Sequence, residues 1–188
     1  MSSTWAEAAE ALLAGRVVLI PTDTVYGLAV IPTLPGATQQ LFDLKGRGRD
    51  IPIAVLAADA AQAFGLAAQP VEGRALKLGL IHWPGALTLV VDRDPGWPGD
   101  IGDATSIGLR CPAHTEVREL CRAVGPLATT SANHHGSPTP VTSADAVAAF
   151  PGIDVVVDGG TLGGEASTVA DCRVVPPRIL RQGGVILR

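Results

Sequence analysis

The chain of 188 residues contains few cysteines and no long hydrophobic run. Its three cysteines, Cys111, Cys121 and Cys172, include no CxxC pair, which argues against a disulfide framework and against a cysteine-rich zinc site. No apolar run approaches the ~18 residues of a membrane span, and the first residues show no secretion-signal pattern. These absences predict a cytoplasmic protein with reduced thiols.

Positive charge and aromatic side chains are also scarce. The formal net charge is −4, with two lysines against twelve arginines, and only 4% of the residues are aromatic. This composition argues against a protein whose main task is to bind the nucleic-acid backbone. An apolar fraction of 47% with 17% charged residues indicates a folded chain with a large core. With no internal repeat, residues 1–188 are expected to form a single domain.

The segment from Pro21 to Leu28 places hydrogen-bonding side chains directly after an apolar run. Residues 17–20 predict a buried strand, which Pro21 ends because proline has no N–H to donate. The polar residues that follow are Thr22, Asp23, Thr24 and Tyr26. In an α/β protein, polar groups at the carboxyl end of a strand can line a ligand site. The same residues also favour an ordinary β-turn, so this segment alone leaves both interpretations open.

A basic, glycine-containing segment, Lys45-Gly46-Arg47-Gly48-Arg49, follows a helix predicted over residues 38–44. Cations at this place could simply stabilise the carboxyl end of the helix. Three cations alternating with two glycines exceed what a helix end requires, and glycine lets the backbone approach a ligand closely. We therefore interpret the segment as an anion-binding loop.

Two further strands carry candidate binding residues. The strand predicted over residues 106–111 holds Arg110 among apolar neighbours, so a buried guanidinium there needs either a carboxylate of this chain or an anionic ligand. Residues 126–133 predict a strand that ends in small polar groups, Ser131 and Asn133. Thr88, in a strand predicted over residues 86–91, is interpreted as an ordinary strand residue rather than a cavity-facing one.

Other polar segments are interpreted as loops. His134 and His135 are adjacent, and adjacent residues rarely bind one metal ion, so no metal site is predicted there. The glycine-rich residues 158–164 lack the spacing of a dinucleotide-binding loop, and no P-loop motif occurs. Residues 92–102 predict a surface loop that is the best candidate for a mobile segment or lid.

The remaining elements follow from capping and periodicity. A helix should begin after Thr4, whose spacing to Glu7 fits a capping box, and end at Gly15. Asp59 and Ser143 are expected to cap two short helices. The other predicted helices cover residues 70–78 and 112–124, and the other predicted strands cover residues 53–56 and 155–157 and a stretch that starts at 167.

Seven sequence blocks, in this order along nearly the whole chain, resemble the YrdC-like family of threonylcarbamoyl-AMP synthases. They are PTDTVYGLA, LFDLKGRGRDIPI, HWPGALTLVV, SIGLRCPAH, PLATTSANHHGSPTP, GEASTVADC and ILRQG. The chain departs from the family pattern at His135, where serine is usual, and at Gln182, where proline is frequent. Some relatives continue into a further carboxyl-terminal domain, so the chain resembles the short form.

The resemblance implies an α/β fold, a single-domain twisted open mixed sheet with flanking helices around a large ligand cavity. It implies an L-threonylcarbamoyladenylate synthase, a nucleotidyltransferase that uses L-threonine, bicarbonate and ATP and serves the t6A modification of tRNA. Magnesium is expected to come with the triphosphate rather than to occupy a protein metal site. Transient contact with the tRNA threonylcarbamoyl-transferase machinery and weak tRNA binding are also expected, without a membrane.

The family motifs assign the expected site residues by position. The expected catalytic residues are Lys45 and Arg47. The expected ATP-binding residues are Lys45, Arg49, Ser106, Arg110, Ser131, Asn133, Thr139 and Arg181. The expected threonine-binding residues are Thr22, Thr24 and Ser167.

Two alternatives share the domain. An RNA-binding module of the same fold should show a basic surface and aromatic stacking platforms, neither of which the composition favours. A carbamoyl-transfer domain of the hydrogenase-maturation type belongs to a much longer protein than this chain.

Overall fold

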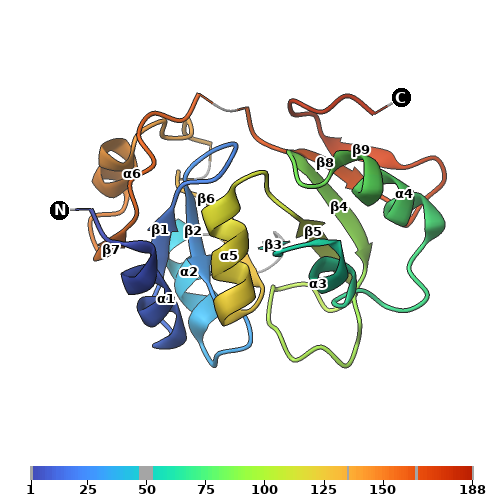
Figure 1. Ribbon diagram of the computed structural model, residues 1–188, viewed down its shortest axis with the longest axis horizontal. Helices are drawn as coiled ribbons and strands as arrows, with labels where there is room; N and C mark the ends of the chain where they lie inside the picture. Colours follow the sequence, from blue (N-terminus) through green and yellow to red (C-terminus); the bar gives the residue numbers. More distant parts are fainter. Residues whose placement is uncertain (1, 47–52, 135, 164, 188) are drawn as a thin grey trace.

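The structure, a computed structural model, describes residues 2–46, 53–134, 136–163 and 165–187. The described residues form nine strands and six α-helices (Figure 1). The strands are β1 (Val18–Ile20), β2 (Gly27–Val30), β3 (Ala54–Leu56), β4 (Leu87–Asp92), β5 (Ser106–Arg110), β6 (Leu127–Ser131), β7 (Val155–Val156), β8 (Thr168–Asp171) and β9 (Arg178–Arg181). The helices are α1 (Trp5–Leu13), α2 (Ala37–Lys45), α3 (Ala60–Phe64), α4 (Gly73–His82), α5 (Thr115–Val124) and α6 (Ser143–Ala149).

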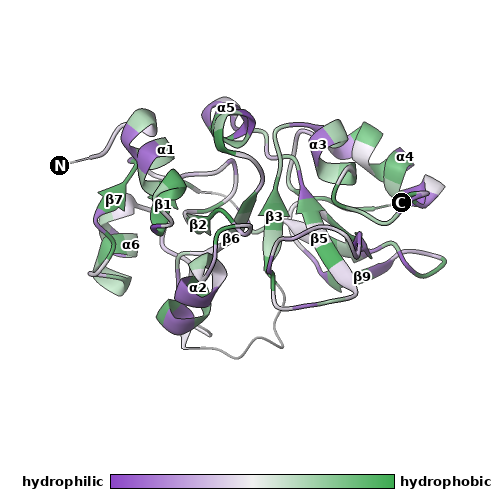
Figure 2. Cartoon of the chain, turned by 90° about the horizontal axis from the view of Figure 1, so that it is seen from below, coloured by the Kyte–Doolittle hydropathy of each residue, from purple (hydrophilic) through white to green (hydrophobic). Residues whose placement is uncertain are grey.

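The strands join in one mixed sheet, in the order β7-β1-β2-β6-β3-β5-β4-β8-β9. The pairs β1–β7, β3–β5 and β4–β8 are parallel, and the other neighbours are antiparallel. Helices flank the sheet, with α1 and α5 side by side on one side and α2 on the other (Figure 2). The expected twisted mixed α/β sheet is thus confirmed.

Strand alternation divides the core into two clusters, as the two-residue period of a strand requires. Val18, Ala29 and Leu127 pack with α1 and α5 in one cluster. Their sequence neighbours, such as Leu28 and Ala128, face a second and larger cluster that includes side chains of α2, α3, α4 and α6. A residue two positions along a strand from a member of the first cluster therefore faces the same side of the sheet as α1 and α5.

Local capping explains most helix boundaries. Thr4 and Glu7 form the predicted capping box, and Asp59 accepts a hydrogen bond from the Gln62 N–H, as expected. The prediction that Ser143 caps α6 was wrong, because Thr142 accepts from the Asp145 N–H while the Ser143 hydroxyl binds Asp158.

Two helices differ in position from the sequence prediction. Helix α4 covers Gly73–His82 instead of residues 70–78. Its carboxyl end falls before the extended Trp83, which precedes Pro84 and so avoids the helical region. Helix α5 begins at Thr115 rather than at Pro112.

The loop predicted over residues 92–102 is tied to the fold at its far end. The Asp100 N–H donates to the Pro32 carbonyl at 2.9 Å, and the Thr38 hydroxyl donates to the Asp100 carboxylate at 3.0 Å. Ile101 is fully buried, and its carbonyl accepts from the Ile53 N–H. This end of the loop therefore belongs to the core.

The described residues also bear on the predicted reduced cysteines and on the predicted lack of a membrane-spanning helix. All three thiols are buried and free, and burial raises the pKa of Cys121 to about 12 and that of Cys172 to about 11. Such thiols are poor nucleophiles. The longest helices in the described ranges have ten residues, too few to cross a bilayer.

Candidate functional site

A cavity of about 450 Å³ opens on the sheet face that also carries α1 and α5. The residues of its floor lie two positions along the strands from members of the core cluster under α1 and α5, and so face the same side of the sheet. Thr129 lies two residues beyond Leu127, and Ala54 lies two residues before Leu56. Apolar side chains thus give way to small and polar ones along the same face.

Small residues keep this floor open. Gly27 lines the cavity, and a Cβ atom there would lie 2.7 Å from the Thr129 methyl group, so glycine is required for this close approach. Gly108 pairs with Ala54 in the adjacent strand and lies two residues before Arg110, so it faces the same side. A side chain at position 108 would project toward the cavity.

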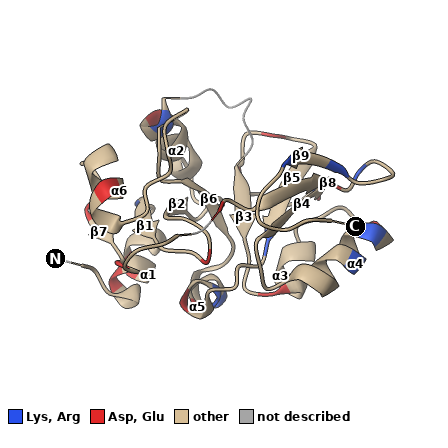
Figure 3. Ribbon diagram, turned by 90° about the horizontal axis from the view of Figure 1, so that it is seen from above, with Lys and Arg blue, Asp and Glu red and all other residues tan. Residues whose placement is uncertain are grey.

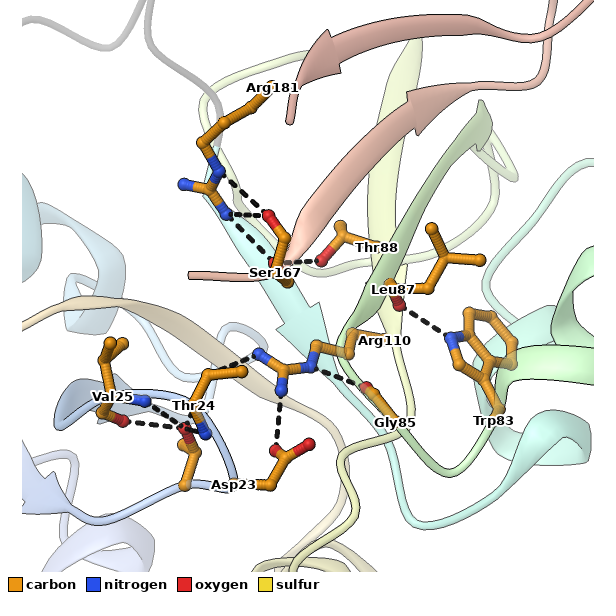
Figure 4. A network of polar contacts seen from close by, with 11 residues as sticks. Asp23, Thr24, Val25, Trp83, Gly85, Leu87, Thr88, Arg110, Ser167 and Arg181 are labelled. Atoms are coloured by element: carbon orange, nitrogen blue, oxygen red, sulfur yellow. Dashed lines mark hydrogen bonds and ion pairs between the residues drawn. The ribbon is translucent and has the colours of Figure 1, made fainter. Parts of the chain in front are cut away.

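One wall of the cavity is built around Arg110, at the end of β5 (Figure 4). The guanidinium donates to the Asp23 carboxylate at 2.6 Å, to the Thr24 hydroxyl at 2.9 Å and to the Gly85 carbonyl at 3.0 Å. The Arg110 and Asp23 side chains are only 7% and 13% exposed. Sequence reasoning left a carboxylate partner and a ligand open as alternatives, and the structure shows the carboxylate pair at the edge of the cavity.

The electrostatics of Arg110 are a balance of opposing effects. Burial lowers the pKa of its guanidinium, and the Asp23 carboxylate raises it again by charge and hydrogen bonding. Asp23 was not among the predicted site residues. Its position beside two cavity-lining threonines is the signal that could have identified it.

The segment after β1 is both a turn and a cavity wall. The Thr22 hydroxyl accepts from the N–H groups of Thr24 and Val25 and donates to the Val25 carbonyl at 2.7 Å. This hydrogen-bonded turn holds Thr24 against Arg110, and both threonines line the cavity. The two interpretations of the segment are therefore compatible.

Tyr26 fixes the glycine-rich residues near 160 to this turn. Its side chain is fully buried, and its hydroxyl lies 3.1 Å from the Asp158 carboxylate and 2.8 Å from the Gly160 carbonyl. The Gly159 N–H donates to the Tyr26 hydroxyl oxygen at 2.9 Å. Tyr26 thus has a structural role under the site.

The opposite wall is formed by Arg181, Ser167 and Thr88 (Figure 4). The Arg181 guanidinium donates to the Ser167 carbonyl and hydroxyl at 2.9 Å, and the Ser167 hydroxyl lies 2.9 Å from that of Thr88. The interpretation of Thr88 as an ordinary strand residue was therefore wrong, because its side chain lines the cavity. A lone polar residue in a strand gave no clue to which face it occupies.

Arg181 has no carboxylate partner among the described residues, unlike Arg110. Partial burial lowers the pKa of its guanidinium, and the charge of Arg110 lowers it further. The two cations thus act on each other across the cavity, and Asp23 compensates only one of them. This excess of positive charge favours an anionic ligand.

The third wall lies at the end of β6. Ser131 and Asn133 line the cavity, and the Ser131 hydroxyl donates to the Asn133 side-chain oxygen at 2.6 Å. Lys45, at the end of α2, donates to the backbone carbonyls of both residues and is 6% exposed. The Lys45 ammonium is therefore largely buried and lies directly behind this wall.

The other predicted site residues have mixed positions. Thr139 lines the cavity. Ser106 lies at the start of β5, outside the lining, and its hydroxyl donates to Asp103 at 2.6 Å. Arg47, Arg49 and His135 lie outside the described residues. His134 contacts the Ala149 carbonyl and the Phe150 ring.

The described residues include no cluster of histidine, cysteine or acidic side chains that could hold a metal ion. Beside the cavity, Asp23 is already committed to Arg110. The donor set that the described residues offer at the cavity therefore does not fit a dedicated magnesium site.

A second and larger hollow, of about 540 Å³, lies between α2 and β7. Its walls include Arg16, Asp43 and Asp154, all of them exposed, and none of the predicted site residues. The 450 Å³ cavity, with its buried cation and hydroxyls, is the candidate site.

Comparison with known proteins identifies the family of this chain. Residues 10–183 match the Sua5/YciO/YrdC family profile, described as "Telomere recombination". A Mycobacterium tuberculosis protein, provisionally named threonylcarbamoyl-AMP synthase, is 40% identical over 178 residues, which cover 93% of this chain and 82% of its own. The threonylcarbamoyl-AMP synthase of Bacillus subtilis is 36% identical over 96% of this chain and 53% of its own.

Among solved structures, Pyrococcus abyssi Sua5 complexed with L-threonine matches with a TM-score of 0.89 and 33% identity. The match covers 96% of this chain and 54% of that one, so the chain spans about half of the Sua5 protein. Escherichia coli YciO, at 23% identity, shares the fold with a TM-score of 0.86. From its profile match and its relatives, this chain belongs to the Sua5/YciO/YrdC family.

Proposed function

We propose that this chain is an L-threonylcarbamoyladenylate synthase, which makes threonylcarbamoyl-AMP and pyrophosphate from L-threonine, bicarbonate and ATP. The observation that carries the proposal is the cavity with two guanidinium groups, of which only Arg110 has a carboxylate partner among the described residues. A triphosphate and an amino-acid carboxylate are both anions that such groups bind. The synthases among the relatives and the L-threonine complex of Pyrococcus abyssi Sua5 support the same assignment.

The chemistry needs positioning more than a nucleophilic side chain. The threonine amine and bicarbonate combine to N-carboxythreonine with loss of water. An oxygen of the new carboxylate attacks the α-phosphorus of ATP, and the bond to pyrophosphate breaks. Holding these anions together and stabilising the charge on phosphorus are the tasks of the site.

The walls of the cavity divide these tasks. Arg110 is fixed by Asp23 and Thr24 and offers its remaining N–H groups to a carboxylate or phosphate. The hydroxyls of Thr22, Thr24 and Ser167 lie in the same cavity and would hold L-threonine.

On the ATP side, Arg181, Ser131, Asn133 and Thr139 line the cavity and Lys45 stands behind it. Ser106 and the loop residues Arg47 and Arg49 complete the proposed set. Magnesium would enter with the triphosphate and offset part of its charge.

The function is tested by the release of pyrophosphate. We expect release to require L-threonine and bicarbonate together, because the attacking carboxylate does not exist until both have reacted. Replacement of L-threonine by valine should abolish most turnover, since a site built to bind the substrate hydroxyl leaves its own polar groups unpaired with valine. Equal release with ATP alone would contradict the proposal and identify a nucleotide hydrolase.

A further inference from the structure

Two buried hydroxyl groups meet in the wall of the cavity. The side-chain oxygens of Thr88 and Ser167 lie 2.9 Å apart, and the two residues are only 3% and 5% exposed. Both residues line the cavity. The proposed function uses Ser167 but gives no task to Thr88, although the Thr88 hydroxyl is directed at a residue of the site.

The Thr88–Ser167 pair has one proton more than the described residues accept. A hydroxyl group donates one hydrogen bond and can accept two. The Ser167 hydroxyl accepts from the Arg181 guanidinium at 2.9 Å, and one hydroxyl proton of the pair forms the bond between Thr88 and Ser167, whichever oxygen donates. No residue in the described part of the chain accepts the second hydroxyl proton. The pair therefore presents an unused donor to the cavity.

Packing fixes the direction of the Thr88 hydroxyl. A Cβ atom at position 108 would lie 3.4 Å from the Thr88 methyl group, so the methyl group occupies the room that Gly108 leaves on the neighbouring strand β5. The hydroxyl is on the side of β8, which runs parallel to β4 and is preceded by Ser167. Because a β-branched side chain has few rotamers, the placed methyl group holds the hydroxyl against Ser167.

The Thr88–Ser167 pair lies between the two arginines of the cavity (Figure 4). When the antiparallel register of β4 and β5 is continued by one residue, Thr88 lies opposite Arg110. On the other side, the Arg181 guanidinium is bound to the Ser167 carbonyl and hydroxyl. An acceptor atom that takes the unused proton is therefore close to both guanidinium groups.

The described strands that hold the pair bring no carboxylate close to it. Strands β4 and β8 carry a charge only at their last residues, Asp92 and Asp171, each four positions beyond the pair. At ~3.3 Å per residue, these carboxylates lie about 13 Å away. Asp23 is already bound to Arg110, and strand β9 begins and ends with arginine (Figure 3). The surroundings of the pair thus favour an anionic acceptor.

One group of the reactants has to lie at this place. The proposed function puts L-threonine at Thr22 and Thr24, beside Arg110, and the triphosphate at Arg181. The carboxylate formed from bicarbonate is bonded to the threonine nitrogen and attacks the α-phosphorus, so it lies between the amino acid and the triphosphate. A hydroxyl donor at that point orients the carboxylate without adding a further charge to the cavity.

We propose that Thr88 is a positioning residue, and that the Thr88–Ser167 pair donates a hydrogen bond to the carboxylate that comes from bicarbonate. The inference rests on the proposed function. The threonine nitrogen bonds to the carbon of bicarbonate, and water leaves, made from the hydroxyl group of bicarbonate and a proton of the amine. One oxygen of the new carboxylate accepts from the pair while the other forms the bond to the α-phosphorus, and the bond from this phosphorus to pyrophosphate breaks.

The test measures the KM for bicarbonate, with bicarbonate added to CO₂-free buffer at saturating ATP and L-threonine. Thr88→Val keeps the shape of the side chain but removes the hydroxyl, and should raise this KM by about tenfold, with less than about a twofold change in the KM for ATP. Thr88→Ser keeps the hydroxyl and should stay close to the unmodified chain.

The matched control is Thr129→Val. Thr129 lines the same cavity, but its hydroxyl already donates to the Leu127 carbonyl at 3.2 Å, so it has no proton to spare for a ligand. The KM for bicarbonate should therefore not change in this variant.

A double-mutant cycle separates positioning from a merely structural role. Ser167→Ala should raise the KM for bicarbonate at least as much as Thr88→Val does. The double variant should be no worse than Ser167→Ala alone, because the two hydroxyl groups act as one donor. Effects on the KM for bicarbonate that simply add, or a rise in every KM together with a lower melting temperature, would show a structural role and overturn the inference.

The separate readouts distinguish the two claims. Loss of adenylate synthesis in the unmodified chain would refute the proposed function, whereas intact synthesis with an unchanged KM for bicarbonate in Thr88→Val would refute only the role of Thr88. A rise confined to the KM for ATP or for L-threonine would also refute it, because the unused proton would then bind the triphosphate or the α-carboxylate. If Thr88→Val does not fold, Ser167→Ala applies the same test from the residue before β8.

Discussion

Arg110 and Arg181 line the same cavity but differ in burial and in the groups that hold them. Arg110 is buried and held by a carboxylate, a hydroxyl and a carbonyl from two other segments of the chain. Arg181 lies on an exposed edge strand and is bound to a single residue, Ser167. The first is fixed before any ligand arrives, whereas the second has its charge uncompensated by a carboxylate in the described chain.

This difference separates a stability role from a binding role. A preorganised guanidinium loses little freedom when a ligand binds, but its removal strands the buried partner that holds it. An exposed guanidinium without a carboxylate partner can be removed at little cost to folding. The two arginines should therefore respond differently to the same substitution.

The largest effect is expected for Arg110→Ala. The change leaves Asp23 buried without its ion-pair partner, and we expect a loss of about 3–5 kcal/mol in the free energy of unfolding together with loss of adenylate synthesis. Urea denaturation measures the first. Arg178→Ala is the control, because Asp171 keeps Arg173 and the loss should stay below about 1 kcal/mol. Equal losses of unfolding free energy in Arg110→Ala and Arg178→Ala would contradict a special stabilising role for the Arg110–Asp23 pair.

Lys45 adds a third cation to the comparison. Lys45→Ala leaves the Ser131 and Asn133 carbonyls short of a donor, so we expect about 1–3 kcal/mol lower stability. If the ammonium also stabilises charge at the α-phosphate, the rate should fall by about 100- to 1,000-fold. Lys45→Arg should lose much of the rate as well, because a planar fork does not fit where a point charge does.

The control for Lys45 is Lys77→Arg, on the exposed side of α4, which should leave adenylate synthesis unchanged. Full activity in Lys45→Ala, measured as steady-state adenylate formation, would exclude Lys45 from the site.

Asp23→Asn isolates the positioning of Arg110. Asparagine keeps the size and one hydrogen bond but removes the charge, so Arg110 should lose its fixed orientation and kcat/KM should fall by about 10- to 100-fold. Asp171→Asn is the control, because Asp171 is also a buried carboxylate paired with arginine, but its partners Arg173 and Arg178 lie outside the cavity lining whereas Arg110 lies in it. It should lower the melting temperature without changing KM for any substrate, and a similar change of KM in both variants would leave Asp23 with a structural role alone.

Arg181→Gln should have the converse effect. We expect the free energy of unfolding to change by less than about 1 kcal/mol, because the side chain has no charged partner to strand. The KM for ATP should rise by about tenfold, since a cation facing the triphosphate is lost. Steady-state kinetics at varied ATP concentration measure the KM for ATP, and a urea titration measures the free energy of unfolding. An unchanged KM for ATP would show that the triphosphate does not bind at Arg181.

The smallest effect is expected for Ser106→Ala. Several hydrogen bonds lower the pKa of Asp103 to about 2, and the one from the Ser106 hydroxyl contributes most. Its loss should therefore lower the free energy of unfolding by about 1 kcal/mol at neutral pH. The folded-state pKa is below the unfolded value, so this stability is present above about pH 4 and disappears as the pH falls toward 2. Urea titrations of both proteins from pH 7 to pH 2.5 should therefore converge at low pH.

The sequence predicted the residues of the site better than their relations. The polar residues after β1 left a ligand site and an ordinary turn open, and it was the family motifs that assigned Thr22, Thr24, Ser167 and Arg181, all of which line the cavity. The Asp23–Arg110 pair joins residues 87 positions apart, and no local pattern encodes such a contact. The contact follows only from the position of β5 in the sheet and from the path of the turn between β1 and β2.

Lys45 shows the same limit. The sequence placed it correctly at the end of a helix, but it was interpreted as part of the anion-binding loop that follows the helix. Its burial depends on β6, which brings two carbonyls from more than 80 residues away to the ammonium. Local propensity fixes the helix end, whereas tertiary packing decides that the cation is enclosed.

The most direct measurement follows the atoms of the product. The chain is incubated with ATP, ¹³C-bicarbonate and ¹⁵N-L-threonine, and the nucleotide products are separated and weighed by mass spectrometry. We predict one adenylate that carries both labels, and we predict that Arg110→Ala does not form it. AMP or ADP without either label as the only nucleotide product of the unmodified chain would contradict the proposal that this cavity joins the three substrates.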